Sequence, residues 1–193
     1  MHGGGLDAAF WLQLFSYKEP SDVPMMVQMA NLGYDVWMGN NRGTRYSNVN
    51  AKYPNADDLE HPDYETEYAA KYDWDMRDQG MLDGPAFIDK MLEVSGKDKA
   101  IYMGYSKGTA QHIHALTQME ETYFADKVEK SILMTPCIAM ADMGVKEHKE
   151  IFDTLDELGI KLLSGPNWKE YHYPRICDKS QSLCDKVAEL GDF

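Results

Sequence analysis

The pentapeptide Gly104-Tyr105-Ser106-Lys107-Gly108 decides how the chain is expected to fold. It matches the pattern G-x-S-x-G and stands between a short apolar run typical of a strand (100–103) and a helical stretch (107–119). A turn this sharp forces the serine into a strained backbone conformation, and the flanking glycines let neighbouring segments approach closely. The pattern predicts that Ser106 Oγ projects above a sheet at a helix N-terminus, where developing negative charge is favoured.

Outward from this turn, short apolar runs alternate with amphipathic stretches. We expect helices over about 23–32 and 78–94, and further strands at 34–38 and 131–134. Alternation of strands and helices is typical of a parallel sheet covered by helices. The sequence therefore predicts the α/β fold class.

A glycine run near the start of the chain, His2-Gly3-Gly4-Gly5, suggests a partner for Ser106. Such a segment lets a backbone N–H face a substrate carbonyl, and a second N–H would come from the residue after the serine. Gly4 and Lys107 are thus the expected backbone donors of an oxyanion hole. Each donor is worth roughly 3–4 kcal/mol in comparable enzymes.

The composition excludes several other functions. The formal net charge is −13, which argues against nucleic acid as a partner. No stretch approaches the roughly 18 consecutive apolar residues of a membrane-spanning helix, and no signal-peptide pattern is visible. The acidic stretch Asn55–Glu67 is interpreted as a solvated loop.

Histidines and cysteines give no metal site. His112 and His114 would point about 200° apart on a helix, so packed or surface positions are the better interpretation. Cys137 looks solitary. Cys177 and Cys184 would lie about 10 Å apart on one unbroken helix, so a disulfide between them requires a bend.

Several motifs resemble the acid lipases, the gastric and lysosomal lipases and their relatives. Residues 32–43, LGYDVWMGNNRG, resemble that family's GYDVW-x-GN-x-RG signature. Residues 83–86 and 102–109 resemble its helix before the nucleophile and the nucleophile turn itself. The chain departs from the family at Tyr105 and Lys107, where His and Gln are usual. The resemblance covers about residues 1–136 well and the remainder weakly.

The resemblance implies a partial α/β-hydrolase fold, with a core over 1–136 and the start of a helical cap over 137–193. It implies a Ser106 nucleophile, an acyl-enzyme, and triacylglycerol or sterol ester substrates, with transient contact to a lipid surface. A Cys177–Cys184 pair would resemble the cap disulfide of the animal enzymes, although the spacing differs. No metal or organic cofactor is implied, and family members are secreted or lysosomal.

The acid and histidine of a catalytic triad are not recognisable in this sequence. In α/β-hydrolases they follow the nucleophile on loops after later strands, and no strand–Asp or strand–His pattern occurs after Ser106. We therefore expect a partial sequence whose isolated chain is inactive. The alternative is a non-catalytic α/β-hydrolase relative that acts as a binding module or as a subunit of a complex.

Overall fold

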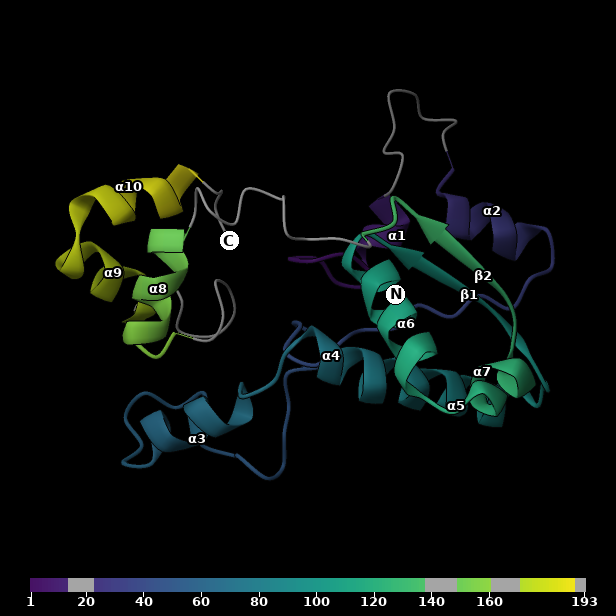
Figure 1. Cartoon of the computed structure of the whole chain (residues 1–193), viewed down its shortest axis with the longest axis horizontal. Coiled ribbons are helices and arrows are strands. Elements are labelled where there is room, and N and C mark those ends of the chain that lie inside the picture. Colours follow the sequence, from purple (N-terminus) through teal and green to yellow (C-terminus); the bar gives the residue numbers. More distant parts are fainter. Residues whose placement is uncertain (14–22, 138–148, 161–170, 190–193) are drawn as a thin grey trace. The chain divides into compact units, whose positions relative to one another are not determined.

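The computed structural model describes residues 1–13, 23–137, 149–160 and 171–189. The chain divides into two compact units (Figure 1). The first unit comprises Met1–Ser47 and Asp75–Ile138, and the second comprises Asn48–Trp74 and Ala139–Phe193. The domain boundary expected near residue 137 stays a prediction. No pattern in the sequence predicted that Asn48–Trp74 would group with the C-terminal helices.

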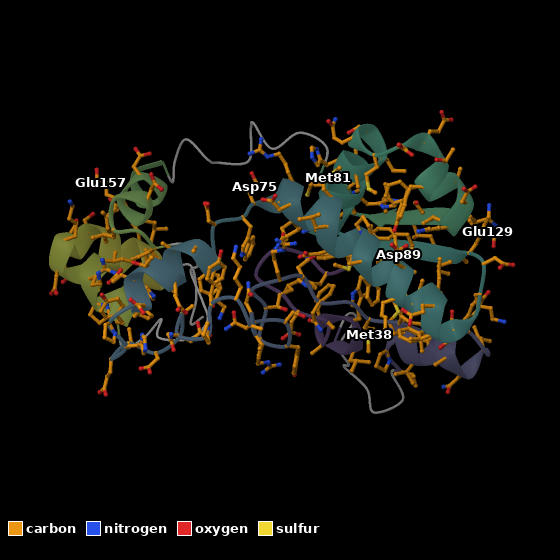
Figure 2. The ribbon with its side chains drawn as sticks, turned by 90° about the horizontal axis from the view of Figure 1, so that it is seen from below. Met38, Asp75, Met81, Asp89, Glu129 and Glu157 are labelled. Carbon is orange, nitrogen blue, oxygen red and sulfur yellow. A yellow bond between two sulfur atoms is a disulfide. The ribbon has the colours of Figure 1, made fainter. Side chains whose placement is uncertain are left out.

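The first unit contains two parallel strands and the helices that pack on them. Helices α6 and α7 lie on one side of the strands and α2 lies on the other (Figure 1; Figure 2). This arrangement confirms the expected α/β class. The elements are α1 (Phe10–Gln13), α2 (Met25–Asn31), α4 (Met76–Asp78), the π-helix η1 (Gln79–Asp83), α5 (Gly84–Ser95), β1 (Ala100–Tyr105), α6 (Lys107–Gln118), α7 (Glu121–Lys127) and β2 (Val128–Met134).

Strands β1 and β2 pair in parallel, with Tyr102 opposite Ser131 and Tyr105 opposite Met134. The start of the chain lies along the other edge of β1. The Met1 amine donates to the Met103 carbonyl oxygen, and the Tyr105 N–H donates to the Met1 carbonyl oxygen at 3.1 Å. Because alternate residues of a strand direct their hydrogen bonds to opposite edges, Met1 and β2 flank β1.

The prediction of a strand at 34–38 was wrong, because these residues pair with no other strand in the part of the chain that the structure describes. An apolar cavity of about 380 Å³ separates this segment from β1, and its lining includes Val36, Met38, Ile101 and Met103. A strand is defined by its backbone partners, and apolar composition alone does not supply one. Ser106 does not line this cavity.

The helix expected over 78–94 is confirmed, but it is interrupted. The chain is helical from α4 to α5, and the π-turn η1 lies between them. At Gly80, an added Cβ would lie 2.6 Å from the Gln111 carbonyl oxygen, so α6 approaches η1 as closely as a bare backbone permits. The helical spacing of apolar residues predicted the extent of the helix, whereas the π-turn η1 depends on packing against α6.

The second unit is helical, with α3 (Tyr64–Lys71), α8 (Lys149–Glu157), α9 (Tyr173–Lys179) and α10 (Gln181–Glu189). The acidic stretch 55–67 is not wholly a loop, because α3 begins within it. Glu67 accepts from the backbone and side chain of Asn55 at 2.6 and 3.0 Å, and Lys71 pairs with Asp57 at 2.5 Å. Glu67 and Asp57 therefore connect α3 to the turns that precede it.

Two clusters form the core of this unit. One is aliphatic and joins α8 to α10, and the other gathers three tyrosines of α3 and its end around Trp74 and Tyr171. Cys177 and Cys184 form a disulfide with their Cα atoms 4.6 Å apart. The chain bends between α9 and α10 at Ser180, which brings the two cysteines closer than a continuous helix would.

Charged side chains such as Glu129 and Glu157 lie at the periphery (Figure 2). Within the described residues, no helix combines the length and apolar character needed to span a bilayer.

Helix α6 packs on β1 through His112, which is 3% exposed and therefore lies in the core. Its ring stacks on Tyr102 at 3.8 Å between centroids, and its Nε2 lies 2.7 Å from Ser131 Oγ on β2. Burial lowers the pKa of His112 to about 4. The expectation of a packed histidine is confirmed.

Replacing Gly108 by alanine is expected to lower the free energy of unfolding. The new Cβ would lie 2.5 Å from the Met1 carbonyl oxygen and 2.9 Å from that of His2, and backbone atoms cannot rotate away. Overpacking of this kind costs roughly 1–3 kcal/mol, against at most about 1 kcal/mol gained from helix propensity. Urea denaturation measures the difference. Gly4→Ala is the control, because its nearest contacts lie at 3.9 Å or more; equal stability of the two variants would contradict the close approach.

Stability should depend on pH through His112. Its folded pKa lies below the usual 6.5, so the unfolded chain binds the proton first as the pH falls. Stability from this group is present above about pH 6.5 and is lost between 6.5 and about 4, by about 3 kcal/mol in total. The stability advantage of wild type over H112Q should shrink across this window, measured by urea denaturation. S131A retains the imidazole and should keep the wild-type slope; a constant advantage of wild type over H112Q would refute the assignment.

Candidate functional site

Ser106 occupies the turn between β1 and α6 in a rare backbone conformation. Its φ is 48° and its ψ is −116°, a combination that L residues seldom adopt and that costs roughly 1–3 kcal/mol. The N–H of Ser106 donates to Met134 O at 3.1 Å, and its carbonyl oxygen accepts from both the N–H and the hydroxyl of Thr109. The turn is thus held on both sides, and the Ser106 side chain is half-buried, not enclosed.

Glycines make this turn possible because backbone segments touch where Cβ atoms would stand. An added Cβ at Gly104 would lie 3.0 Å from the Gly108 carbonyl group, and one at Gly108 would meet Met1 and His2. Tyr102 on β1 donates from its hydroxyl to the Gly108 carbonyl oxygen at 2.7 Å. The second half of β1 and the first turn of α6 are therefore fixed to each other across the serine.

The opening loop, His2–Gly5, lies against this turn. An added Cβ at Gly3 would lie 3.3 Å from Ser106 Cβ, and one at Gly4 would lie 3.9 Å from the Lys107 side chain. Segments far apart in sequence thus meet at the serine. The structure brings together Ser106, Gly4 and Lys107, the three residues for which the sequence predicts a catalytic role.

Two backbone amides beside Ser106 are available as donors. Lys107 is the first residue of α6, where helical N–H groups lack an intrahelical acceptor. Neither this N–H nor that of Gly4 donates to another described residue. Gly4 is exposed to solvent. The role of these two amides as oxyanion donors stays a prediction from the sequence.

A polar network holds the opening loop from behind. His2 is fully buried; its Nδ1 lies 2.8 Å from the Gly3 carbonyl oxygen and its Nε2 accepts from the Asn41 N–H at 3.2 Å. These contacts fix the neutral tautomer that carries hydrogen on Nδ1, and burial lowers the pKa of His2. Asn41 therefore holds His2, and Asn40 Oδ1 accepts from the Ala8 N–H at 2.8 Å.

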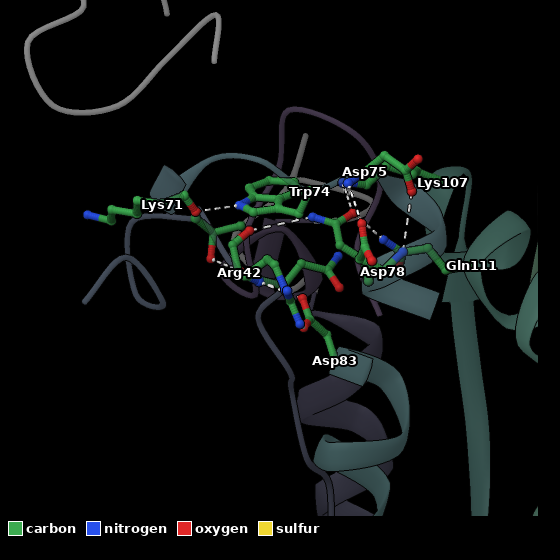
Figure 3. Close-up of polar contacts among 11 residues, drawn as sticks. Arg42, Lys71, Trp74, Asp75, Asp78, Asp83, Lys107 and Gln111 are labelled. Atoms are coloured by element: carbon green, nitrogen blue, oxygen red, sulfur yellow. Dashed lines mark hydrogen bonds and ion pairs between the residues drawn. The ribbon is translucent and has the colours of Figure 1, made fainter. Parts of the chain in front are cut away.

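The next residue, Arg42, anchors the same segment to η1. Its backbone N–H and its Nε donate to the two carboxylate oxygens of Asp83 at 2.8 and 2.7 Å (Figure 3). A guanidinium N–H of Arg42 also lies 2.6 Å from Asp83 Oδ1. Such a two-point ion pair fixes direction as well as distance.

The sequence did not single out Cys137 as a site residue. Its Sγ lies 3.8 Å from Ser106 Oγ, and its N–H donates to Thr109 Oγ1 at 2.9 Å. No histidine among the described residues hydrogen-bonds to Ser106. In the same residues, no group of three or more His, Cys, Asp or Glu side chains is arranged to hold a metal ion.

Comparison with known proteins gives consistent relatives. The chain is 30% identical over 167 residues to a probable lipase of Schizosaccharomyces pombe, which covers 83% of this chain and 33% of that protein. It is 29% identical over 199 positions to a second probable lipase of that yeast, covering 100% of this chain and 41% of the relative. Human lipase member M is 30% identical over 145 residues, 75% of this chain and 30% of its own length.

The chain belongs to a lipase family of the α/β-hydrolase superfamily. It spans about a third of the length of these lipases. No family model and no solved structure matches it.

In this lipase-family chain, the contact between Ser106 and Cys137 can be tested chemically. The variant Ser106→Cys should form a disulfide with Cys137 under mild oxidation, because the two side chains already touch. Peptide mapping without reductant measures the cross-link. Ser131→Cys is the control, since Ser131 lies elsewhere on β2 and its hydroxyl contacts His112 of α6. Equal trapping at both positions would show that the contact is not specific.

Proposed function

We propose that Ser106 is the nucleophile of a carboxylic ester hydrolase. The observation that carries the proposal is the backbone of Ser106, which has a positive φ between a parallel strand and a helix. Gly3 lies so close to it that an added Cβ would be 3.3 Å from Ser106 Cβ. Strained residues of this kind persist where the surrounding structure over-determines them, and they concentrate at active sites. Membership of a lipase family supports ester hydrolysis as the reaction.

The proposed reaction has two halves. Ser106 Oγ attacks the acyl carbonyl while a base takes the hydroxyl proton, and the amides of Gly4 and Lys107 hold the oxyanion. Collapse expels the alcohol, which takes the proton from the protonated base, and leaves an acyl-enzyme. Water then attacks the acyl group with the same base, and the fatty acid leaves as Ser106 regains its proton.

The substrates we propose are lipid esters. The relatives include a protein named triacylglycerol lipase 1 from Arabidopsis thaliana, 29% identical over 86% of this chain and 38% of the relative. Triacylglycerols or sterol esters are therefore the proposed class. Because such esters are insoluble in water and collect in lipid surfaces, we also propose that the protein contacts a lipid surface transiently.

The base and its orienting acid are proposed to come from outside the described residues. Within them, Ser106 Oγ contacts only a thiol, so the hydroxyl has no group to accept its proton. Because no strand–Asp or strand–His pattern follows Ser106 in the sequence, we propose that the 193-residue chain alone does not turn over. The alternative, a non-catalytic α/β-hydrolase relative that binds a ligand or a partner, is favoured by the same missing base.

Labelling with a fluorophosphonate probe separates the two functions. In the protein isolated from its natural source, the probe should attach to Ser106, identified by peptide mapping. A recombinant Ser106→Ala form of the same natural protein should not be labelled. Absence of label on the natural protein would support the binding module.

Hydrolysis of a p-nitrophenyl ester tests the second part of the proposal. The purified 193-residue chain should show no turnover above that of its Ser106→Ala variant. Turnover that disappears on this substitution would show that the chain carries its own base, and the proposed division of the catalytic groups would be wrong.

A further inference from the structure

The side chain of Lys107 spans the space between the opening loop and η1. Its aliphatic stem lies under Gly4, where an added Cβ would lie 3.9 Å from Lys107 Cδ and 4.0 Å from Lys107 Cβ. Its ammonium donates to Gln79 Oε1 at 2.9 Å. One residue therefore contacts the loop with its stem and η1 with its head.

The acceptor of this bond is itself fixed. Gln79 is 2% exposed, and its Oε1 also accepts from Gln111 Nε2 at 2.6 Å. Figure 3 shows Lys107 and Gln111 side by side in this network. The π-turn places Gln79 here, and the bare backbone of Gly80 lets α6 come close enough for both donors to reach one oxygen.

Among the residues that the structure describes, no carboxylate pairs with the Lys107 ammonium, and the acceptor of its hydrogen bond is the neutral amide of Gln79. Burial lowers the pKa of Lys107, and the more distant Asp83 opposes this effect. The Lys107 side chain is therefore held at its end by a hydrogen bond to Gln79, and its aliphatic stem lies beside Gly4.

We infer that the Lys107–Gln79 hydrogen bond is a tether that sets the position of the opening loop against Ser106. Lys107 supplies a donor through its backbone and positions the other donor, Gly4, through its stem. Gln79 is a positioning residue that acts through Lys107. This inference rests on the proposed function for its catalytic meaning, but the tether itself is a structural statement with its own test.

Hydrogen–deuterium exchange tests the tether without catalysis. Lys107→Met keeps a stem and loses the ammonium, and Gln79→Leu removes the acceptor. Both should speed exchange of the Asn41 amide, which donates to His2 Nε2 in the opening loop, several-fold and leave β2 unchanged. Lys90→Met is the matched control, because Lys90 is exposed and its ammonium pairs with Glu93. An unchanged exchange rate at Asn41, or faster exchange throughout the unit, would overturn the tether. Gln79→Glu retains an acceptor and should restore protection.

Binding of a phenylboronic acid tests the catalytic meaning. The Ser106 oxygen adds to boron and its proton passes to solvent, giving an anionic tetrahedral adduct whose oxygen needs both amides. Affinity should fall roughly tenfold or more in Lys107→Met and Gln79→Leu, and stay at the wild-type value in Lys90→Met. Wild-type affinity in the tether variants would overturn the positioning role. If the natural protein binds no more boronate than its recombinant Ser106→Ala form does, the proposed function fails, and the exchange result still decides the tether.

Discussion

The structure of the site depends on one close approach of backbone to backbone. The first turn of α6 lies so near the start of the chain that a single methyl group at Gly108 would collide with two carbonyl oxygens. This approach brings the opening loop to Ser106, and it is compatible only with glycine. Hydrogen bonds then hold the strained backbone of Ser106: its N–H donates to Met134 on β2, and its carbonyl oxygen accepts from Thr109 on α6.

Polar contacts extend this constraint outward. The backbone of Asn41 holds His2, and Arg42 binds Asp83 at the end of η1. Gln79, at the start of η1, accepts a hydrogen bond from Lys107. The π-turn therefore connects both sides of the site. A π-turn often marks a functional region because it widens a helix locally and redirects a side chain. Here the redirected side chain is Gln79.

The departure of this chain from the family pattern at Lys107 has a physical meaning in this arrangement. The longer side chain supports the loop from below, while its backbone amide stays available at the helix start. Cys137, which the sequence did not mark as a site residue, contacts the Ser106 hydroxyl. Composition gives no signal for such a contact, because it depends on how the chain leaves β2.

The sequence by itself determined the α/β class, the helices around β1 and the turn at Ser106, since these follow from local periodicity and from glycine spacing. It could not determine that residues 34–38 lack strand partners, that α3 begins inside the acidic stretch, or that Cys177 and Cys184 meet at a bend. Those features depend on which backbone groups find partners and where distant segments pack. Only the tertiary structure decided that Gly4, Ser106 and the Lys107 side chain lie together, because contact between distant residues is set by packing and not by the pattern around each one.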